Sequence, residues 1–330
     1  MLDGEFRMSQ SLSKIFLPLL LALPLAAATW TEDFSSNPAA TGWQIFGDTN
    51  LFTWDATHQN LAVTWDSSRS NTYFWRPFGT ILAKQDDFSF AFDLRLTDLA
   101  TGLTPGKTNA FEFTIGLLNF NNATNTSLWR GTGVNSAHGA RNTCEFDYFP
   151  DAGFGDTISP TLIASNNQFS TAFAFPLTLD PGALFHIAMS YTAANRTLTT
   201  TMTRNGAAFG PIPDVIFSAS RDFRFDRFAV ISWSDAGTAD SLLAHGTVDN
   251  ITLTTPPPAV QNFSIARTNS LSQAQLTSRT NFFYTLERTA DFQTWANSSP
   301  TVSGTGTTLL LQDTNAPAAK YFYRVRAERP

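Results

Sequence analysis

Acidic residues gather in one short stretch of the chain, and their spacing suits a hard metal ion. Glu145, Asp147, Asp151 and Asp156 all fall within residues 145–156. On a strand Glu145 and Asp147 share a face, because side chains repeat every two residues. Pro150 then ends the strand, and a glycine-containing loop can return the later acids toward the first pair. Crowded carboxylates repel one another unless protons or a cation intervene, and Ca²⁺ prefers oxygen ligands. The stretch therefore predicts a calcium site; the alternative is a plain surface loop, because Asp also favours turns.

The same stretch resembles the metal loop of the legume lectins. In that family a Glu-x-Asp strand runs into an aromatic residue, an Asn or Asp, and a later Asp, as residues 145–156 do. By this resemblance Glu145 is a transition-metal ligand, and Asp147 and Asp156 bridge the transition-metal and calcium sites. Phe149 gives its carbonyl oxygen to calcium and Asp151 gives its carboxylate. Asp151 is also the one sugar-binding residue that the family pattern places.

One departure from the family pattern changes the expected metal. The family has a His five positions after the last Asp, where this chain has Thr161, so we expect calcium alone. The resemblance extends over residues 30–255 through a strand order that the whole concanavalin A-like group shares. It implies an all-β fold with a concanavalin A-like jelly-roll sandwich. It also implies non-catalytic, calcium-assisted binding of carbohydrate or a cell-surface glycan.

Glu145 and Asp147 also resemble the catalytic strand of bacterial β-glucanases of this fold. A retaining glycosidase needs two carboxyl groups about 5–5.5 Å apart. The second Glu of that family follows the first by four or five residues, where this chain has Phe149 and Pro150. We therefore expect no enzyme activity. Two alternatives stay open: a glycoside hydrolase with an unrecognised site, and a structural or adhesive surface protein without sugar affinity.

Tryptophan residues are the other candidates for contact with a sugar. Trp54, Trp65, Trp75 and Trp129 can stack on sugar rings if they line a groove of a sheet, whereas most Trp in β-sandwiches is core. Nearby arginines that can donate to hydroxyl groups are Arg69, Arg76, Arg130 and Arg141. The four histidines are scattered without metal-ligand spacing. Cys144 lies beside acids that raise a thiol pKa, so we expect no nucleophile there.

Composition limits the fold and the class of partner. Only 15% of the 330 residues are charged, the net charge is −6, and there is one cysteine, so no intrachain disulfide can form. Nucleic acid is not an expected partner, because phosphate binding needs a basic face. Thirty Phe and eight Trp among dense strand formers predict an all-β protein.

Alternating apolar and polar residues mark the strands that must position these candidates. Period-two patterning covers residues 60–65, 88–96, 111–115, 186–191 and 250–253. Asn205-Gly206 predicts a tight hairpin between residues 197–204 and 207–209. So many strands in one block indicate two stacked antiparallel sheets.

The amino end predicts export. Lys14, the apolar residues 15–25 and Ala26-Ala27-Ala28 have the order of a signal peptide, so we assign residues 1–28 to it. The apolar run is shorter than the roughly 20 residues that span a bilayer. We expect a secreted or cell-surface bacterial protein with no membrane span after cleavage.

Three consecutive prolines divide the rest of the chain. We predict a sandwich over residues 29–253, a proline-rich linker over 254–259 and a small β module over 260–330. The expected strands of that module cover residues 281–288, 307–312 and 320–326. Its closing Tyr-Phe-Tyr-Arg-Val-Arg strand resembles small fibronectin type III or immunoglobulin-like modules.

Overall fold

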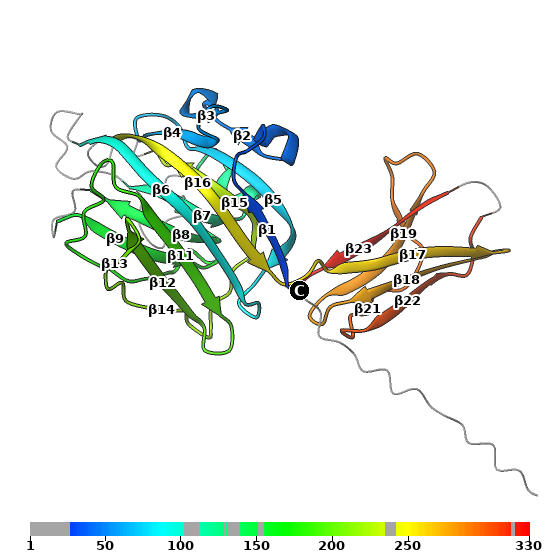
Figure 1. Ribbon diagram of the computed structural model, residues 1–330. Helices are drawn as coiled ribbons and strands as arrows, with labels where there is room; N and C mark the ends of the chain where they lie inside the picture. Colours follow the sequence, from blue (N-terminus) through cyan, green and yellow to red (C-terminus); the bar gives the residue numbers. More distant parts are fainter. Residues whose placement is uncertain are drawn as a thin grey trace, which may run out of the picture.

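The chain folds almost entirely into antiparallel β-structure, which confirms the predicted fold class. The computed structural model describes residues 27–101, 112–128, 130, 139–150, 155–234, 242–317 and 321–330. Figure 1 shows a larger body and a smaller one that meet near the proline-rich segment. Each has its own hydrophobic core. We call the described residues up to Thr255 the first module and those from Val260 the second module.

Two sheets build the first module. The strand order of one is β13-β12-β11-β6-β16-β4-β3, with β1 beside β16 and β14 beside β12, and that of the other is β10-β9-β8-β7-β15-β5-β2. The bounds in the first sheet are β1 (Ala28–Glu32), β3 (Phe52–Asp55), β4 (Asn60–Asp66), β6 (Phe88–Ala100), β11 (Phe185–Thr192), β12 (Thr197–Arg204), β13 (Ala207–Phe209), β14 (Val215–Ile216) and β16 (Leu243–Thr255). Those in the second are β2 (Gln44–Phe46), β5 (Thr72–Leu82), β7 (Phe113–Leu118), β8 (Thr143–Phe149), β9 (Thr157–Ile163), β10 (Phe169–Thr171) and β15 (Phe225–Ser232). Short helical turns within the described residues connect strands, among them η1 (Pro38–Thr41), η2 (Thr49–Leu51) and α1 (Phe120–Ala123).

Aromatic side chains from both sheets fill the space between them. Phe92 of β6 lies 5.7 Å from Phe146 of β8, measured between ring centroids, and Phe90 of β6 lies 5.8 Å from Phe228 of β15. All four rings are buried. Burial of each such side chain contributes roughly 1.5–3 kcal/mol, so the period-two pattern of β6 places its apolar residues where they stabilise the sandwich most.

The Asn205-Gly206 hairpin forms where the sequence predicts it. Strands β12 and β13 pair up to Arg204 and Ala207, directly across the turn. Asn205 and Gly206 have φ angles of 51° and 82°. A type I′ turn needs positive φ at both central residues, which Asn and Gly tolerate best.

The second module contains two smaller sheets. The strand order of one is β17-β18-β22, and in the other β19 pairs with β20, β21 and β23. Their bounds are β17 (Val260–Thr268), β18 (Leu271–Ser278), β19 (Phe283–Thr289), β20 (Ala296–Asn297), β21 (Val302–Ser303), β22 (Thr308–Asp313) and β23 (Phe322–Glu328). Tyr284 and Leu286 of β19 are fully buried in its core. The likeness to fibronectin type III or immunoglobulin-like modules stays a prediction.

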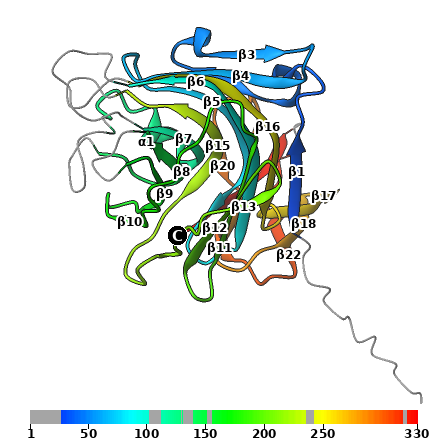
Figure 2. The ribbon, with the colours of Figure 1, turned by 60° about the vertical axis from the view of Figure 1, so that its left-hand side comes forward.

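The first described strand begins at the end of the predicted signal peptide. Strand β1 starts at Ala28 and pairs with the last part of β16, as Figures 1 and 2 show. Residues 1–26 lie outside the described part of the chain. Within the described part, no helix is long and apolar enough to cross a membrane.

Candidate functional site

Strand β8 carries Glu145 and Asp147 on the face of its sheet that points away from the core. Phe146, between them, contacts Phe92 across the sandwich. The strand register sets Thr114 of β7 opposite Asp147, and the Thr114 hydroxyl donates to Asp147 Oδ1 over 2.7 Å. Both carboxylates are fully buried. The two acids therefore sit side by side in a site closed to water.

An arginine lies between these acids. Arg130 Nη2 is 2.8 Å from Glu145 Oε2 and 3.5 Å from Asp147 Oδ2, and Arg130 Nε is 2.9 Å from Glu112 Oε1. We call Glu112, Arg130, Glu145 and Asp147 the acid–arginine cluster. Its arginine is 7% exposed and its acids 2% or less. Sequence reasoning missed Glu112, and it treated Arg130 as a donor to sugar hydroxyls rather than as the partner of these acids.

Burial dominates the protonation of the acid–arginine cluster. Loss of water raises the pKa of Glu145 to about 8, although the nearby Arg130 guanidinium acts in the opposite direction. The same cause raises the pKa of Glu112 and of Asp147. The pKa of the Cys144 thiol is also raised, first by burial and then by the two acids of β8. Burial therefore favours the protonated form of these acids, and Cys144 is a poor nucleophile.

The described residues do not fit the predicted calcium site. Asp156 accepts a hydrogen bond from the Tyr148 hydroxyl over 3.2 Å. Tyr148 directly follows Asp147 on β8, so the two side chains point to opposite faces of the sheet. The Tyr148 hydroxyl also accepts from the Leu179 amide, which fixes it there. Asp151 lies outside the described residues, and Phe149 ends β8 half-buried. In the part of the chain that the structure describes, no three His, Cys, Asp or Glu residues are placed to hold a metal ion.

Trp65 is buried in the core, and the other two described tryptophan candidates are packed rather than open. Trp75 is 8% exposed, and its ring lies 4.3 Å from that of Phe120 with the Arg227 guanidinium 5.1 Å away. Trp54 is half-buried and donates from Nε1 to the Phe34 carbonyl oxygen over 2.9 Å. Trp129 lies outside the described residues. Neither described ring is a free platform for a sugar.

The chain that follows β7 covers this face of the sheet. The Tyr73 hydroxyl of β5 donates to the carbonyl oxygen of Ala123 in α1 over 2.8 Å. Further along the same segment, the Leu128 carbonyl oxygen accepts a hydrogen bond from the Asn71 side-chain amide over 3.0 Å. This path brings Arg130 to the acids of β8 and leaves the face filled by protein.

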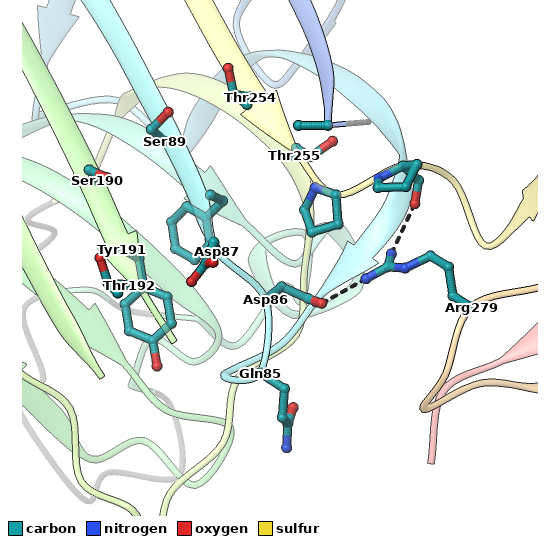
Figure 3. Close-up of a pocket in the computed structure, with 14 residues that line it drawn as sticks. Gln85, Asp86, Asp87, Ser89, Ser190, Tyr191, Thr192, Thr254, Thr255 and Arg279 are labelled. Carbon is teal, nitrogen blue, oxygen red and sulfur yellow. Dashed lines mark hydrogen bonds and ion pairs between the residues drawn. The ribbon is translucent and has the colours of Figure 1, made fainter. Parts of the chain in front are cut away.

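An open hollow of about 550 Å³ lies instead where the two modules meet (Figure 3). We call it the seam hollow. Its walls come from the β5–β6 turn and the start of β6, the ends of β11 and β16, the linker prolines, Ala27 and Arg279 of the second module. The residues with polar side chains that line it are Gln85, Asp86, Asp87, Ser89, Ser190, Tyr191, Thr192, Thr254, Thr255 and Arg279.

Several of these polar groups have no protein partner. Among the described residues, the side chains of Gln85, Ser89, Ser190 and Thr192 make no hydrogen bond. Asp87 accepts from the Ala193 amide through Oδ1 over 2.7 Å, and its other oxygen has no partner in the same described set. The seam hollow thus offers hydroxyl, amide and carboxylate groups that can donate to and accept from a ligand.

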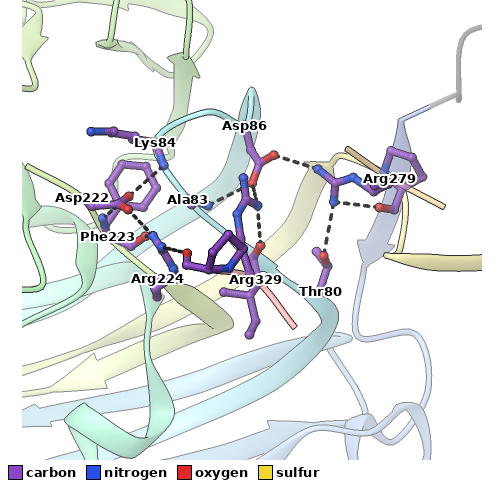
Figure 4. A network of polar contacts seen from close by, with 12 residues as sticks. Thr80, Ala83, Lys84, Asp86, Asp222, Phe223, Arg224, Arg279 and Arg329 are labelled. Carbon is purple, nitrogen blue, oxygen red and sulfur yellow. Dashed lines mark hydrogen bonds and ion pairs between the residues drawn. The ribbon is translucent and has the colours of Figure 1, made fainter. Parts of the chain in front are cut away.

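One carboxylate fixes the second module beside this hollow. Arg279 Nη2 donates to Asp86 Oδ1 over 2.7 Å, and Arg329 donates to Asp86 Oδ2 (Figure 4). Arg279 also donates to the carbonyl oxygen of Pro257 over 3.0 Å. We call Asp86, Arg279 and Arg329 the Asp86 clamp. Asp86 and Arg329 are 5% and 3% exposed, so the clamp is buried and the walls of the seam hollow are held in place.

Comparison with known proteins gives likeness at the level of structure only. No known family model matches the sequence, and no curated protein matches it.

The structural neighbours are legume lectins and legume-lectin-like domains. A peanut lectin in complex with a nine-residue peptide is 12% identical, covering 70% of this chain and 97% of its own, with a TM-score of 0.48. The winged bean acidic lectin in complex with methyl-α-D-galactose is 10% identical over 70% and 99% of the two chains, with a TM-score of 0.43. A legume lectin-like domain from Entamoeba histolytica is 9% identical over 68% and 95%, with a TM-score of 0.42. The likeness concerns the path of the backbone.

Proposed function

We propose that this chain is an exported, non-catalytic carbohydrate-binding protein and that its sugar site is the seam hollow. The observation that carries the proposal is the set of unpartnered polar side chains in that hollow. Gln85, Ser89, Ser190 and Thr192 come from two neighbouring strands and a turn, and they line one space of ligand size. Such groups match the hydroxyls of a sugar.

Two further features of the seam hollow support a sugar as its ligand. Pro256 and Pro257 add apolar ring surface to the same space, which suits the C–H faces of a sugar ring. Asp86 is already paired with two arginines, which balance its negative charge in the seam hollow. The Asp87 carboxylate also lines the hollow, so a short neutral saccharide fits better than an anionic ligand.

The acids that resemble a catalytic pair support a non-catalytic role. Glu145 and Asp147 are fully buried and face Arg130, and the chain that follows β7 covers the same face. A general acid must reach the bond that it protonates. Calcium is not part of the proposal, because the described residues do not fit it.

Replacing Ser190 with tryptophan should weaken sugar binding strongly. Ser190 is exposed on β11, so the larger ring fills the hollow without entering the core. We expect at least a ~10-fold loss of affinity, which corresponds to about 1.4 kcal/mol. A glycan array, with and without EDTA, identifies the ligand, and calorimetric titration of that ligand measures the loss.

Thr203→Trp is the matched control for this experiment. Thr203 lies on β12 opposite His186 and does not line the seam hollow. This variant should bind like the wild-type protein. A Ser190→Trp protein that binds the sugar with wild-type affinity would contradict the proposed site.

A structural or adhesive role without sugar affinity is the second candidate. The filled face of the seven-stranded sheet favours it, because Trp75 and the acids of β8 are closed off there. A protein that binds no glycan on the array, in either buffer, would support this role.

The exported protein should begin at Thr29. Lys14, the apolar residues 15–25 and three alanines precede this position, and cleavage after Ala28 leaves residues 29–32 paired with β16. N-terminal sequencing of protein recovered from the medium or periplasm of a bacterial host measures this. A first residue of Met1 or Met8 would count against export through this segment.

A further inference from the structure

The acid–arginine cluster has the charges of a metal site but is closed around a guanidinium. Three carboxylates converge on Arg130 from two parts of the chain: Glu112 precedes β7, and Glu145 and Asp147 lie on β8. Each has an oxygen within 3.5 Å of an Arg130 nitrogen. The site thus already contains one internal cation.

The geometry of Arg130 leaves a divalent cation poorly placed. The guanidinium is planar and rigid, and here its Nε and Nη2 edges face different carboxylates. It keeps its proton in proteins, so it cannot become a metal ligand. It also contributes a positive charge within a few ångströms of the carboxylate oxygens that a metal would need. Calcium, which takes 6–8 oxygen ligands, would have to displace it.

The rest of the cluster is built for this arginine. The Thr114 hydroxyl donates to Asp147 Oδ1, the oxygen that Arg130 does not approach. The ring of Phe169, on β10, lies 5.2 Å from the guanidinium, within the range of a cation–π contact. The guanidinium therefore has an aromatic neighbour as well as its acidic partners.

We infer that Arg130 is the resident cation of this cluster and that it makes the fold independent of divalent metal ions. The guanidinium provides from within the chain the positive charge that a bound ion would otherwise supply to the buried acids. On this inference, the positive charge that the acids of residues 145–156 require comes from Arg130, where the sequence predicted calcium.

Thermal unfolding of the whole chain with three variants tests this role. The wild-type midpoint should be the same in EDTA, in millimolar calcium and in millimolar manganese. Arg130→Met keeps most of the side-chain length without the charge, and its midpoint should be roughly 6–20 °C lower. Arg130→Lys keeps a charge and should lie closer to the wild-type protein. Arg130→Ala also leaves space, and calcium or manganese at about 100 times its dissociation constant should raise its midpoint by roughly 5–10 °C.

Arg227→Ala is the matched control, because Arg227 contacts the Trp75 ring on the same sheet but no acid of the cluster. It should show no response to either ion. A wild-type midpoint that rises with calcium would overturn the inference. So would an Arg130→Met protein as stable as Arg130→Lys, failure of both to fold, or an Arg130→Ala protein that ignores both ions.

Discussion

Asp86→Ala should lower the stability of the second module's attachment by about 3–5 kcal/mol, the cost of removing one partner from a buried ion pair. The variant leaves Arg279 and Arg329 without their shared carboxylate, and Arg329 is only 3% exposed. We expect a single thermal transition in the wild-type protein and two in the variant, because the modules then unfold separately. Differential scanning calorimetry measures the transitions, and small-angle scattering measures the expected increase in radius.

Two variants separate the loss of the ion pair from other effects of the substitution. Asp87→Ala removes the neighbouring carboxylate, which is exposed and outside the clamp, and it should keep one transition. Asp86→Ala combined with Arg279→Met and Arg329→Met should recover part of the loss, because no buried charge is left alone. A single unshifted transition in Asp86→Ala would show that the clamp does not hold the modules together.

Stability should fall as the pH rises from about 4.5 to about 8. Burial, opposed by Arg130, raises the pKa of Glu145 from 4.5 to about 8 in the folded protein. Between these values the folded chain holds a proton that the unfolded chain releases, so unfolding becomes more favourable as pH increases. One such proton changes the free energy of unfolding by up to about 1.4 kcal/mol per pH unit. The raised pKa values of Glu112 and Asp147 act in the same direction.

Glu145→Gln should flatten this pH dependence, because the amide has no proton to lose in that range. Urea unfolding at half-unit steps from pH 5 to 9 measures the slope for each protein. Glu328→Gln, which changes an exposed acid far along the chain, should keep the wild-type slope. Equal slopes for the wild-type and Glu145→Gln proteins would show that Glu145 does not carry the effect.

Local pattern was enough to predict several of the strands. Alternation predicted β4, β6 and β11 within a few residues of their ends, and Asn205-Gly206 predicted its hairpin because both residues accept positive φ. These features depend on neighbours in sequence, so a single sequence contains them.

Contacts between distant residues explain what the sequence could not predict. Spacing placed Glu145 and Asp147 on one face, but it did not show that Arg130 would be carried back across that face. Motif likeness grouped Asp156 with them, whereas the Tyr148 hydroxyl holds it elsewhere. In the Asp86 clamp, Arg279 lies 193 positions and Arg329 lies 243 positions from Asp86 along the chain. No local pattern marks pairs so far apart.

The Asp86 clamp also makes the two modules depend on each other to different degrees. A second module joined to an unrelated first module would bring Arg279 and Arg329 to a surface without their carboxylate, at the cost of two unpaired guanidinium groups. A first module that lost its companion would keep only Asp86, still bonded to the Ala83 amide and free to be hydrated. The two arginines of the second module therefore depend on the β5–β6 turn for their carboxylate, whereas Asp86 keeps a partner within the first module.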